Sequence, residues 1–109
     1  MNELRNERVA HALQREISDI LQHEIKDPRV GLVSITDVEV SSDLRQAKVF
    51  FSVIGGDDER KRAAEGLASA TGFIRAEVAG RVRLHHAPEL VFAGDDSIEP
   101  PLRQRRRRL

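Results

Sequence analysis

The chain has 109 residues, a length that predicts a single domain with one small hydrophobic core. Hydrophobic residues make up 39% and charged residues 33%, so we expect a densely charged surface and no large internal pocket. The sequence has no cysteine, which excludes disulfides, thiolate chemistry and cysteine-ligated metals. The charged N-terminus and the lack of a long apolar run predict a cytoplasmic protein with no membrane partner.

The formal charges balance at 18 basic and 18 acidic side chains, but they are unevenly distributed. The last nine residues, PLRQRRRRL, hold five arginines and no acid, so the first 100 residues carry 13 basic and 18 acidic groups. Residues 72–88 are locally basic, with Arg75, Arg81 and Arg83 against Glu77. These two basic segments are candidates for binding an anion.

The first half of the chain predicts a helix followed by a hairpin. Apolar residues recur at spacings of three and four from Val9 to Ile25, which predicts a helix over about residues 4–26 that ends before Pro28. Residues 32–41 and 46–54 are rich in β-branched residues with alternating polarity, typical of two antiparallel strands. A shift in the phase of that alternation predicts a bulge or a late start in the first strand.

The second half predicts helical structure and one more strand. A helical pattern runs from about residue 59 to 82, but glycine in Ala70-Thr71-Gly72 is unfavourable there, so we expect two helices that meet at a kink. Residues 89–92 predict a short third strand entered from Pro88. The predicted fold is α+β, in the order α-β-β-α-kink-α-β, and residues after about 98 are expected to be disordered.

Few residues are suited to catalysis. The histidines are too few and too scattered for a metal site, and each Asp pair lies beside glycine, where turns and helix caps are the usual explanation. We therefore expect no metal, no cofactor and no enzyme activity. A small hydrolase that depends on Asp95 or His85 is the least favoured alternative.

Binding of phosphate is better supported. A second helix beginning after the kink would present free backbone amides and the positive end of its dipole to an anion. Arg75, Arg81 and Arg83 could line the same edge, although a solvated polar face explains each of them equally well. Tryptophan and tyrosine are absent and the phenylalanines mostly fall on core positions, with Phe50 as the one exception. We therefore expect recognition of RNA shape and backbone rather than of base sequence.

Several motifs in a fixed order along residues 5–98 resemble the ribosome-binding factor A family of bacteria. They are the segments 24–29 (EIKDPR), 43–44 (DL) before 47–49 (AKV), 72–75 (GFIR), 83–84 (RL), 88–92 (PELVF) and 95–98 (DDSI). The resemblance implies a type II KH-like RNA-binding domain over residues 1–98, with a three-stranded sheet and helices on one face. In that family an A-x-G kink, here Ala70-Thr71-Gly72, replaces the usual G-x-x-G loop.

The resemblance also implies a function. Members of the family are non-enzymatic factors that bind the free 30S small ribosomal subunit and its 16S rRNA, support late maturation and processing of the rRNA 5′ end, and are needed in the cold. The implied RNA-facing residues are Ala70, Thr71, Gly72 and Arg75, with Arg81 and Arg83 as weaker candidates. We expect a monomer, with other small-subunit assembly factors such as GTPases as further partners.

The C-terminal tail, residues 99–109, departs from the family pattern after Glu99, where two prolines and an arginine run follow. Arg105, Arg106, Arg107 and Arg108 could still supply electrostatic contacts to RNA. The alternative function is a KH-like adaptor that binds protein through its acidic body, which would show little dependence on salt. We also expect Gly72→Val to damage fold and binding together, and Arg75→Ala to weaken binding with little loss of stability.

Overall fold

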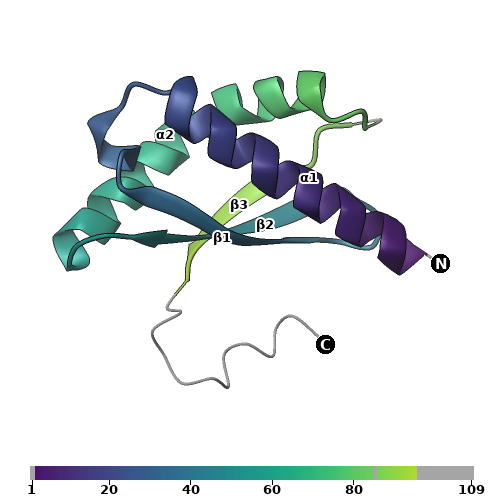
Figure 1. Ribbon diagram of the computed structural model, residues 1–109, viewed down its shortest axis with the longest axis horizontal. Helices are drawn as coiled ribbons and strands as arrows, with labels where there is room; N and C mark the ends of the chain where they lie inside the picture. The colour runs from purple at the N-terminus through teal and green to yellow at the C-terminus, as the bar shows by residue number, and fades with distance from the viewer. Residues whose placement is uncertain (1, 85, 96–109) are drawn as a thin grey trace.

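The computed structural model describes residues 2–84 and 86–95, with side chains from residue 5 onward. The elements are the helix α1 (Asn2–His23), the 3-10 helix η1 (Pro28–Val30), the strands β1 (Val33–Val40) and β2 (Gln46–Val53), the helix α2 (Asp57–Arg81) and the strand β3 (Glu89–Gly94). Both α1 and α2 lie on the same face of the sheet (Figure 1). The predicted α+β fold is confirmed, with helices on one face of three strands.

The central strand of the sheet is β2, which pairs antiparallel with β1 and parallel with β3. The predicted hairpin is confirmed, and its register shifts between Ile35 and Asp37, so the irregularity expected in the first strand is a bulge. In the connecting turn Leu44 takes a positive φ of 61°, and the Asp43 carboxylate accepts a hydrogen bond from the Ser41 hydroxyl at 2.7 Å. This turn sets the register that puts alternate β2 side chains against the helices.

The core lies between the helices and the sheet. The apolar stripe of α1 is buried as its spacing predicts, and α1 ends at His23, three residues earlier than expected. After it, Asp27 caps η1 by accepting a hydrogen bond from the Arg29 backbone N–H at 2.9 Å. Gly66 lets η1 pack on α2, because a Cβ there would lie 3.0 Å from atoms of Arg29 and Val30. The fully buried core side chains include Leu13, Ile17, Ile20, Val49, Leu67, Ile74 and Val78.

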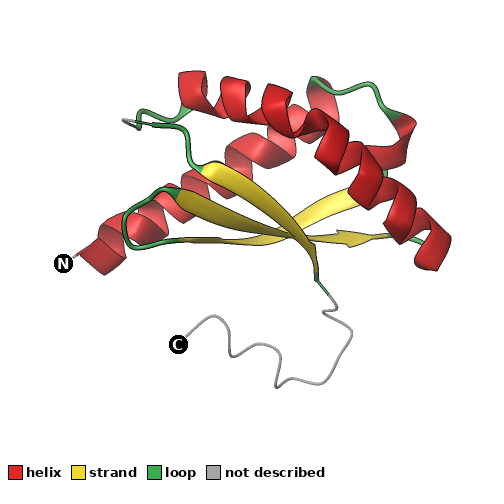
Figure 2. Cartoon of the chain, turned by 180° about the vertical axis from the view of Figure 1, so that it is seen from behind, coloured by secondary structure: helices red, strands yellow, loops and turns green. Residues whose placement is uncertain are grey.

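The expected pair of helices is instead one continuous helix. The helix α2 runs for 25 residues through Gly72 without a break. Leu67, Ile74 and Val78 lie on one buried stripe that spans the glycine, and each is 0% exposed. Burial of such side chains contributes about 1.5–3 kcal/mol each, which exceeds the cost of about 1 kcal/mol for a glycine in a helix. The helix is nevertheless bent: α2 changes direction in the middle of its course (Figure 2).

Candidate nucleic-acid interface

The bend segment, residues 70–72, has two unusual features: the Thr71 side chain forms a hydrogen bond with a helix carbonyl, and Gly72 is open to solvent. The hydroxyl of Thr71 donates a hydrogen bond to the Leu67 carbonyl at 2.8 Å, a contact that often bends helices. Ala70 is half-buried and packs against the core, whereas Gly72 is exposed and a Cβ placed there would meet no atom within 4 Å. The fold therefore does not need glycine at position 72 for space, and the backbone there can be approached from outside.

The anion site expected from a second helix N-terminus is not formed. Because α2 is continuous, the backbone amides that follow Gly72 lie in the interior of a helix rather than in its first turn. The positive end of the α2 dipole lies instead at Gly56 and Asp57, where the Glu59 carboxylate already accepts the Gly56 N–H at 2.8 Å. Phosphate binding near Gly72 would depend on side chains and on close approach rather than on free amides.

The outward surface of the second half of α2 carries small side chains and one aromatic ring. Phe50 lies outside the core cluster, as the sequence predicts, but it is only 9% exposed, whereas Phe73 beside Gly72 is 46% exposed. The ring that is open to stacking is therefore Phe73, which the sequence pattern had placed on a core position. Helical spacing could have revealed Phe73, because it directly precedes the buried Ile74 and so points about 100° away from it. The exposed small residues on this helix half are Ser69, Gly72, Ala76, Ala79 and Gly80.

Arg75 binds the connection between α2 and β3. Its Nε donates a hydrogen bond to the Pro88 carbonyl and its Nη2 donates one to the Ala87 carbonyl, both at 3.0 Å. Carbonyl partners leave the positive charge unneutralised, and a guanidinium has five N–H donors, so three remain beyond these two contacts. Arg75 is exposed and can bind a phosphate while it holds the connection in place.

Arg81 is instead surrounded by carboxylates at the contact between α1 and α2. Its Nη1 lies 2.7 Å from Asp19 and 3.2 Å from Glu16, and its Nη2 lies 3.6 Å from both Glu24 and Glu77. The hydrogen bond from Arg81, with a further one from His23, lowers the pKa of Asp19. The same pair with Asp19 raises the pKa of Arg81. Four acidic neighbours reduce the attraction of this arginine for an RNA phosphate.

Of the remaining predicted residues, only Arg83 lies within the part of the chain that the structure describes. Arg83 lies in the connection after α2, is exposed, and makes no ion pair with a described residue. His85 and the tail residues Arg105–Arg108 fall outside the described residues. The bend segment, Phe73, Arg75 and Arg83 are all at least partly exposed, and all lie on α2 or directly after it. We call this set the α2 surface.

The groove between α1 and β1 does not suit a phosphate, and no metal site is found among the described residues. A groove of about 390 Å³ between α1 and β1 is lined by Glu7, Asp37 and Glu39 among others, and these carboxylates repel phosphate. In the described residues no group of three or more metal-ligating side chains is arranged to hold an ion. Asp95, the acid of the hydrolase alternative, accepts a hydrogen bond from the Thr36 hydroxyl at 2.5 Å. No helix among the described residues has the length and apolar character to cross a membrane.

A mixed three-stranded sheet with helices on one face and an exposed, partly basic helix surface defines a small binding domain. The sequence model of the ribosome-binding factor A family matches residues 5–106, and the chain belongs to this family. This family is non-catalytic, as predicted for the chain from its residues.

Relatives and solved structures agree with this assignment. Ribosome-binding factor A of Halothermothrix orenii is 52% identical over 91% of this chain and 81% of its own length. Ribosome-binding factor A of Brevibacillus brevis is 50% identical over 91% of this chain and 82% of its own length. The crystal structure of ribosome-binding factor A from Thermus thermophilus matches with a TM-score of 0.72 at 25% identity, covering 82% of this chain and 94% of that one.

A second Thermus thermophilus structure is similar as well. It is a homology model of ribosome-binding factor A fitted into a cryo-electron microscopy map of its complex with the 30S subunit. It matches this chain with a TM-score of 0.64 at 26% identity and covers 81% of this chain and 92% of that one.

Proposed function

We propose that this protein binds the free 30S subunit as an assembly factor in the cytoplasm and acts on its late maturation. The observation that carries the proposal is family membership over residues 5–106, together with the similarity to a structure placed in a 30S complex. Processing of the 5′ end of 16S rRNA and support of growth in the cold belong to the proposal as consequences of correct maturation. The domain boundary near residue 98, the monomeric state and GTPase partners stay predictions.

Within this function we assign the rRNA contact to the α2 surface. The exposed Gly72 and its small neighbours allow a phosphate backbone to come close to the helix. Arg75 and Arg83 supply charge at the end of this surface, and Phe73 supplies a ring on which a base can stack. Arg81 is the weakest of the predicted contacts because its charge is shared among four carboxylates.

Co-sedimentation with isolated 30S subunits over a series of salt concentrations tests the proposal. The variant Arg83→Ala should reduce the slope of log affinity against log salt by about 0.7 to 0.9, the value for one phosphate contact. The matched control is Arg15→Ala, because Arg15 is also an exposed arginine and its side chain on α1 is 75% exposed. Equal slopes for Arg83→Ala and the unchanged protein would remove Arg83 from the interface.

The same experiment separates the adaptor alternative. A phosphate-dominated complex loses affinity steeply as salt rises, whereas a protein-only contact responds weakly. Binding to 30S subunits that does not change with salt would favour the adaptor. Absence of binding at low salt, to both mature and precursor subunits, would overturn the proposed function.

A further inference from the structure

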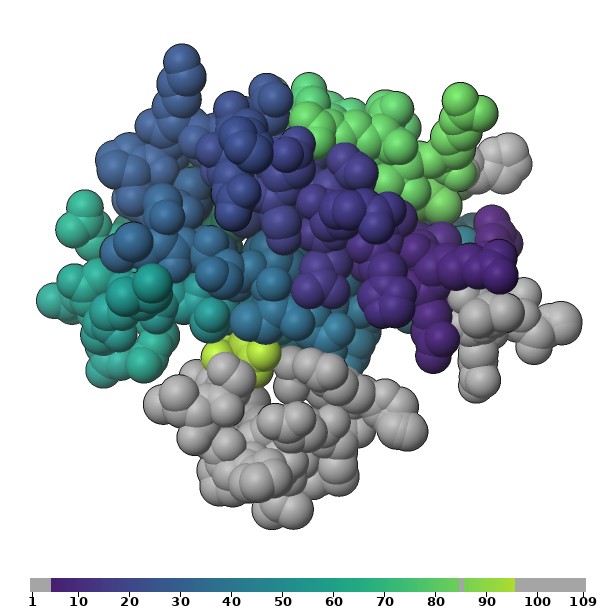
Figure 3. All heavy atoms as spheres, in the orientation of Figure 1, coloured from purple at the N-terminus to yellow at the C-terminus, as the bar shows by residue number. Residues whose placement is uncertain are grey.

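An apolar groove lies where β1 begins and β2 ends. It has a volume of about 340 Å³ and lies between the end of α1 and the start of β1. Figure 3 shows this end of the molecule at the left, where the blue chain around η1 lies above the teal start of α2. The groove lining holds no charged side chain, although charged residues make up 33% of the sequence. Its large apolar side chains are Leu21, Ile25, Val30, Leu32 and Ile54.

Two of these side chains project far into solvent. Leu32 is 50% exposed and Ile54 is 72% exposed, the two highest values among the large apolar residues of the described chain. They are neighbours, because the Ile54 N–H donates a hydrogen bond to the Leu32 carbonyl at 3.4 Å. An exposed apolar patch beside a groove is typical of a contact surface for another molecule.

The groove also borders a free edge of the sheet, because β1 is an outer strand. Successive residues of an antiparallel strand point their backbone groups alternately toward the partner strand and away from it. The Leu32 carbonyl points toward β2, whereas the Ile35 carbonyl points away and accepts a hydrogen bond from the Gln14 side chain at 3.5 Å. Val33 has the outward orientation of Ile35, so its N–H and C=O lie at the open edge, beside the groove that Val33 lines.

Two cations lie around the groove. Lys26 is exposed and directly follows Ile25. Arg62 lines a smaller cavity of about 120 Å³ that also includes Leu32. Within the described chain neither cation forms an ion pair.

Two carboxylates of the same region already have partners in the chain. Asp27 accepts hydrogen bonds from the Arg29 side chain, the shortest at 2.7 Å. Glu59, which lines the smaller cavity with Arg62, accepts the Gly56 N–H at 2.8 Å. The charges at the rim therefore favour a partner that carries carboxylates.

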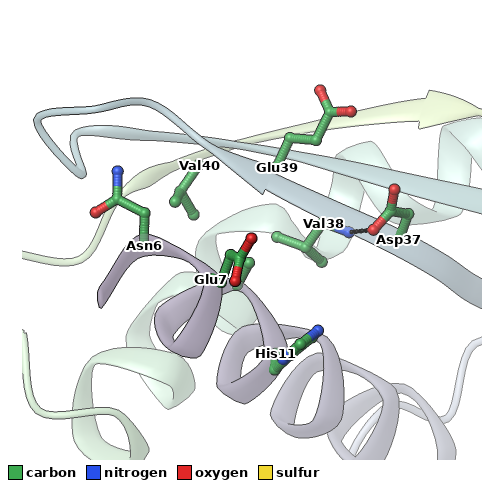
Figure 4. A pocket seen from close by; sticks show the side chains of 8 residues that line it. Asn6, Glu7, His11, Asp37, Val38, Glu39 and Val40 are labelled. Atoms are coloured by element: carbon green, nitrogen blue, oxygen red, sulfur yellow. Dashed lines mark hydrogen bonds between the residues drawn. The ribbon is translucent and has the colours of Figure 1, made fainter. Parts of the chain in front are cut away.

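The groove at the other end of β1 has a different character. Asn6, Glu7 and His11 of α1 contribute polar side chains to its lining (Figure 4). A segment with aliphatic side chains therefore fits beside Leu32 rather than there.

We propose that an extended protein segment with alternating aliphatic and acidic residues binds at the start of β1. Its backbone pairs with Val33, and its aliphatic side chains pack on Leu32 and Ile54, as in other peptides that add a strand to a sheet edge. The groove lining has no aromatic ring on which a base can stack, which favours protein over RNA. This contact is separate from the rRNA contact of the α2 surface and does not depend on it.

NMR titration of the isotope-labelled full chain tests the proposal. The probe is a capped synthetic heptapeptide, Ile-Asp-Val-Asp-Val-Glu-Ile. The amide signals of residues 31–35 and 54–55 should shift saturably, while those of residues 72–76 on α2 stay in place. No shift at the groove, or equal shifts over the whole chain, would overturn the proposal.

Two altered peptides test how the segment binds. N-methylation of two adjacent central residues blocks an edge-facing N–H in either register, and should weaken binding about tenfold. A basic peptide with lysine at each acidic position should also bind more weakly than the acidic one. Equal affinity of all three peptides would overturn the edge pairing and the preference for carboxylates.

Matched variants test the groove itself. Ile54→Ala shortens a side chain that is 72% exposed, so it should retain the fold and weaken the acidic peptide about tenfold. The control Val91→Ala shortens an exposed apolar side chain of β3 and should leave the affinity unchanged. The double variant Lys26→Gln with Arg62→Gln should remove the preference for the acidic peptide. Unchanged affinity of Ile54→Ala would overturn the proposal.

Two further measurements test other occupants of the groove. An oligouridine strand that shifts the signals of residues 31–35 more strongly than the peptide would assign the groove to RNA. Shifts of these signals with protein concentration alone would assign it to a second copy of the chain. Either result would overturn the proposal.

Discussion

Arg75 of α2 and Pro88, which immediately precedes β3, are joined by a hydrogen bond of 3.0 Å from the guanidinium to the proline carbonyl. Pro88 is buried, and the adjacent Ala87 carbonyl accepts a second hydrogen bond from the same guanidinium. One side chain thus fixes the connection that carries Arg83 and leads into the parallel strand. Arg75 has a structural role that its sequence position did not reveal.

Substitution of Arg75 should therefore affect stability as well as binding, contrary to the expectation from sequence. Arg75→Ala removes two charge-assisted hydrogen bonds and should lower the free energy of unfolding by about 1–3 kcal/mol, toward the low end because the site is exposed. Urea unfolding measures this loss. Arg75→Lys keeps the charge but not the forked geometry, and should recover 30S binding only in part. Unchanged stability of Arg75→Ala would contradict the structural role.

Substitution of two glycines of α2 by alanine should change the stability of the protein in opposite directions. Gly72→Ala meets no atom within 4 Å and should stabilise the helix by about 0.5–1 kcal/mol. Gly66→Ala presses a methyl group on Arg29 and Val30 at 3.0 Å and should lower stability by about 1–3 kcal/mol. Thermal and urea unfolding of both variants check the pair. For the same reason Gly72→Val should retain the fold, and a loss of 30S binding by it would then report on the interface alone.

Phe73 is expected to matter for binding and little for the fold. Phe73→Ala removes a ring that is 46% exposed, and loss of a stacked base would weaken RNA binding by about 1–3 kcal/mol. Val91→Ala is the control, because Val91 is an exposed apolar residue of β3 at 38%. Binding to 30S subunits, measured beside the unfolding midpoint, should fall for the first variant only. Equal binding of both variants would exclude stacking on Phe73.

Stability should fall in acid partly because of Asp27. Hydrogen bonds from the Arg29 side chain, and then from the Arg29 backbone N–H, lower the pKa of the Asp27 carboxyl. A carboxyl with a lowered pKa in the folded state contributes stability above its unfolded pKa of about 4 and loses it as pH falls through the folded value. Asp27→Asn should therefore show a smaller difference in unfolding free energy between about pH 7 and about pH 3. An unchanged difference would contradict the contribution of this pair.

Arg81 provides a test that separates structure from binding. Arg81→Met leaves Glu16, Asp19, Glu24 and Glu77 without their shared cation, so the unfolding midpoint should fall. Added salt screens the exposed carboxylates and should reduce this loss. If Arg81 binds 30S subunits directly, the variant will also show a smaller salt slope in co-sedimentation. Equal slopes would place its role in the contact between α1 and α2.

The sequence predicted most of the fold because its apolar spacing was regular. The stripe from Val9 to Ile25 and the alternation in the hairpin gave the right elements, and the β1 bulge followed from their phase. The tendency of Gly72 to end the helix was overestimated. Local helix propensity does not include the burial of Ile74 and Val78, which follow the glycine and stabilise the continuous helix. The site was harder to predict. Helical spacing places Glu77 beside Arg81, but its hydrogen-bond partners on α1, Asp19 and Glu16, lie 62 and 65 residues away in sequence, so only the fold brings these to it.

The parallel pairing of β3 with β2 also determines the order in which the sheet can be completed. The hairpin of β1 and β2 is local, whereas β3 is 36 residues further along the chain than the end of β2. Because α2 lies between them, one edge of the central strand stays unpaired until residues 89–94 have been synthesised and α2 has docked. Any chain shortened before Glu89 exposes that edge, so loss of the last strand should produce association between chains rather than a smaller stable domain.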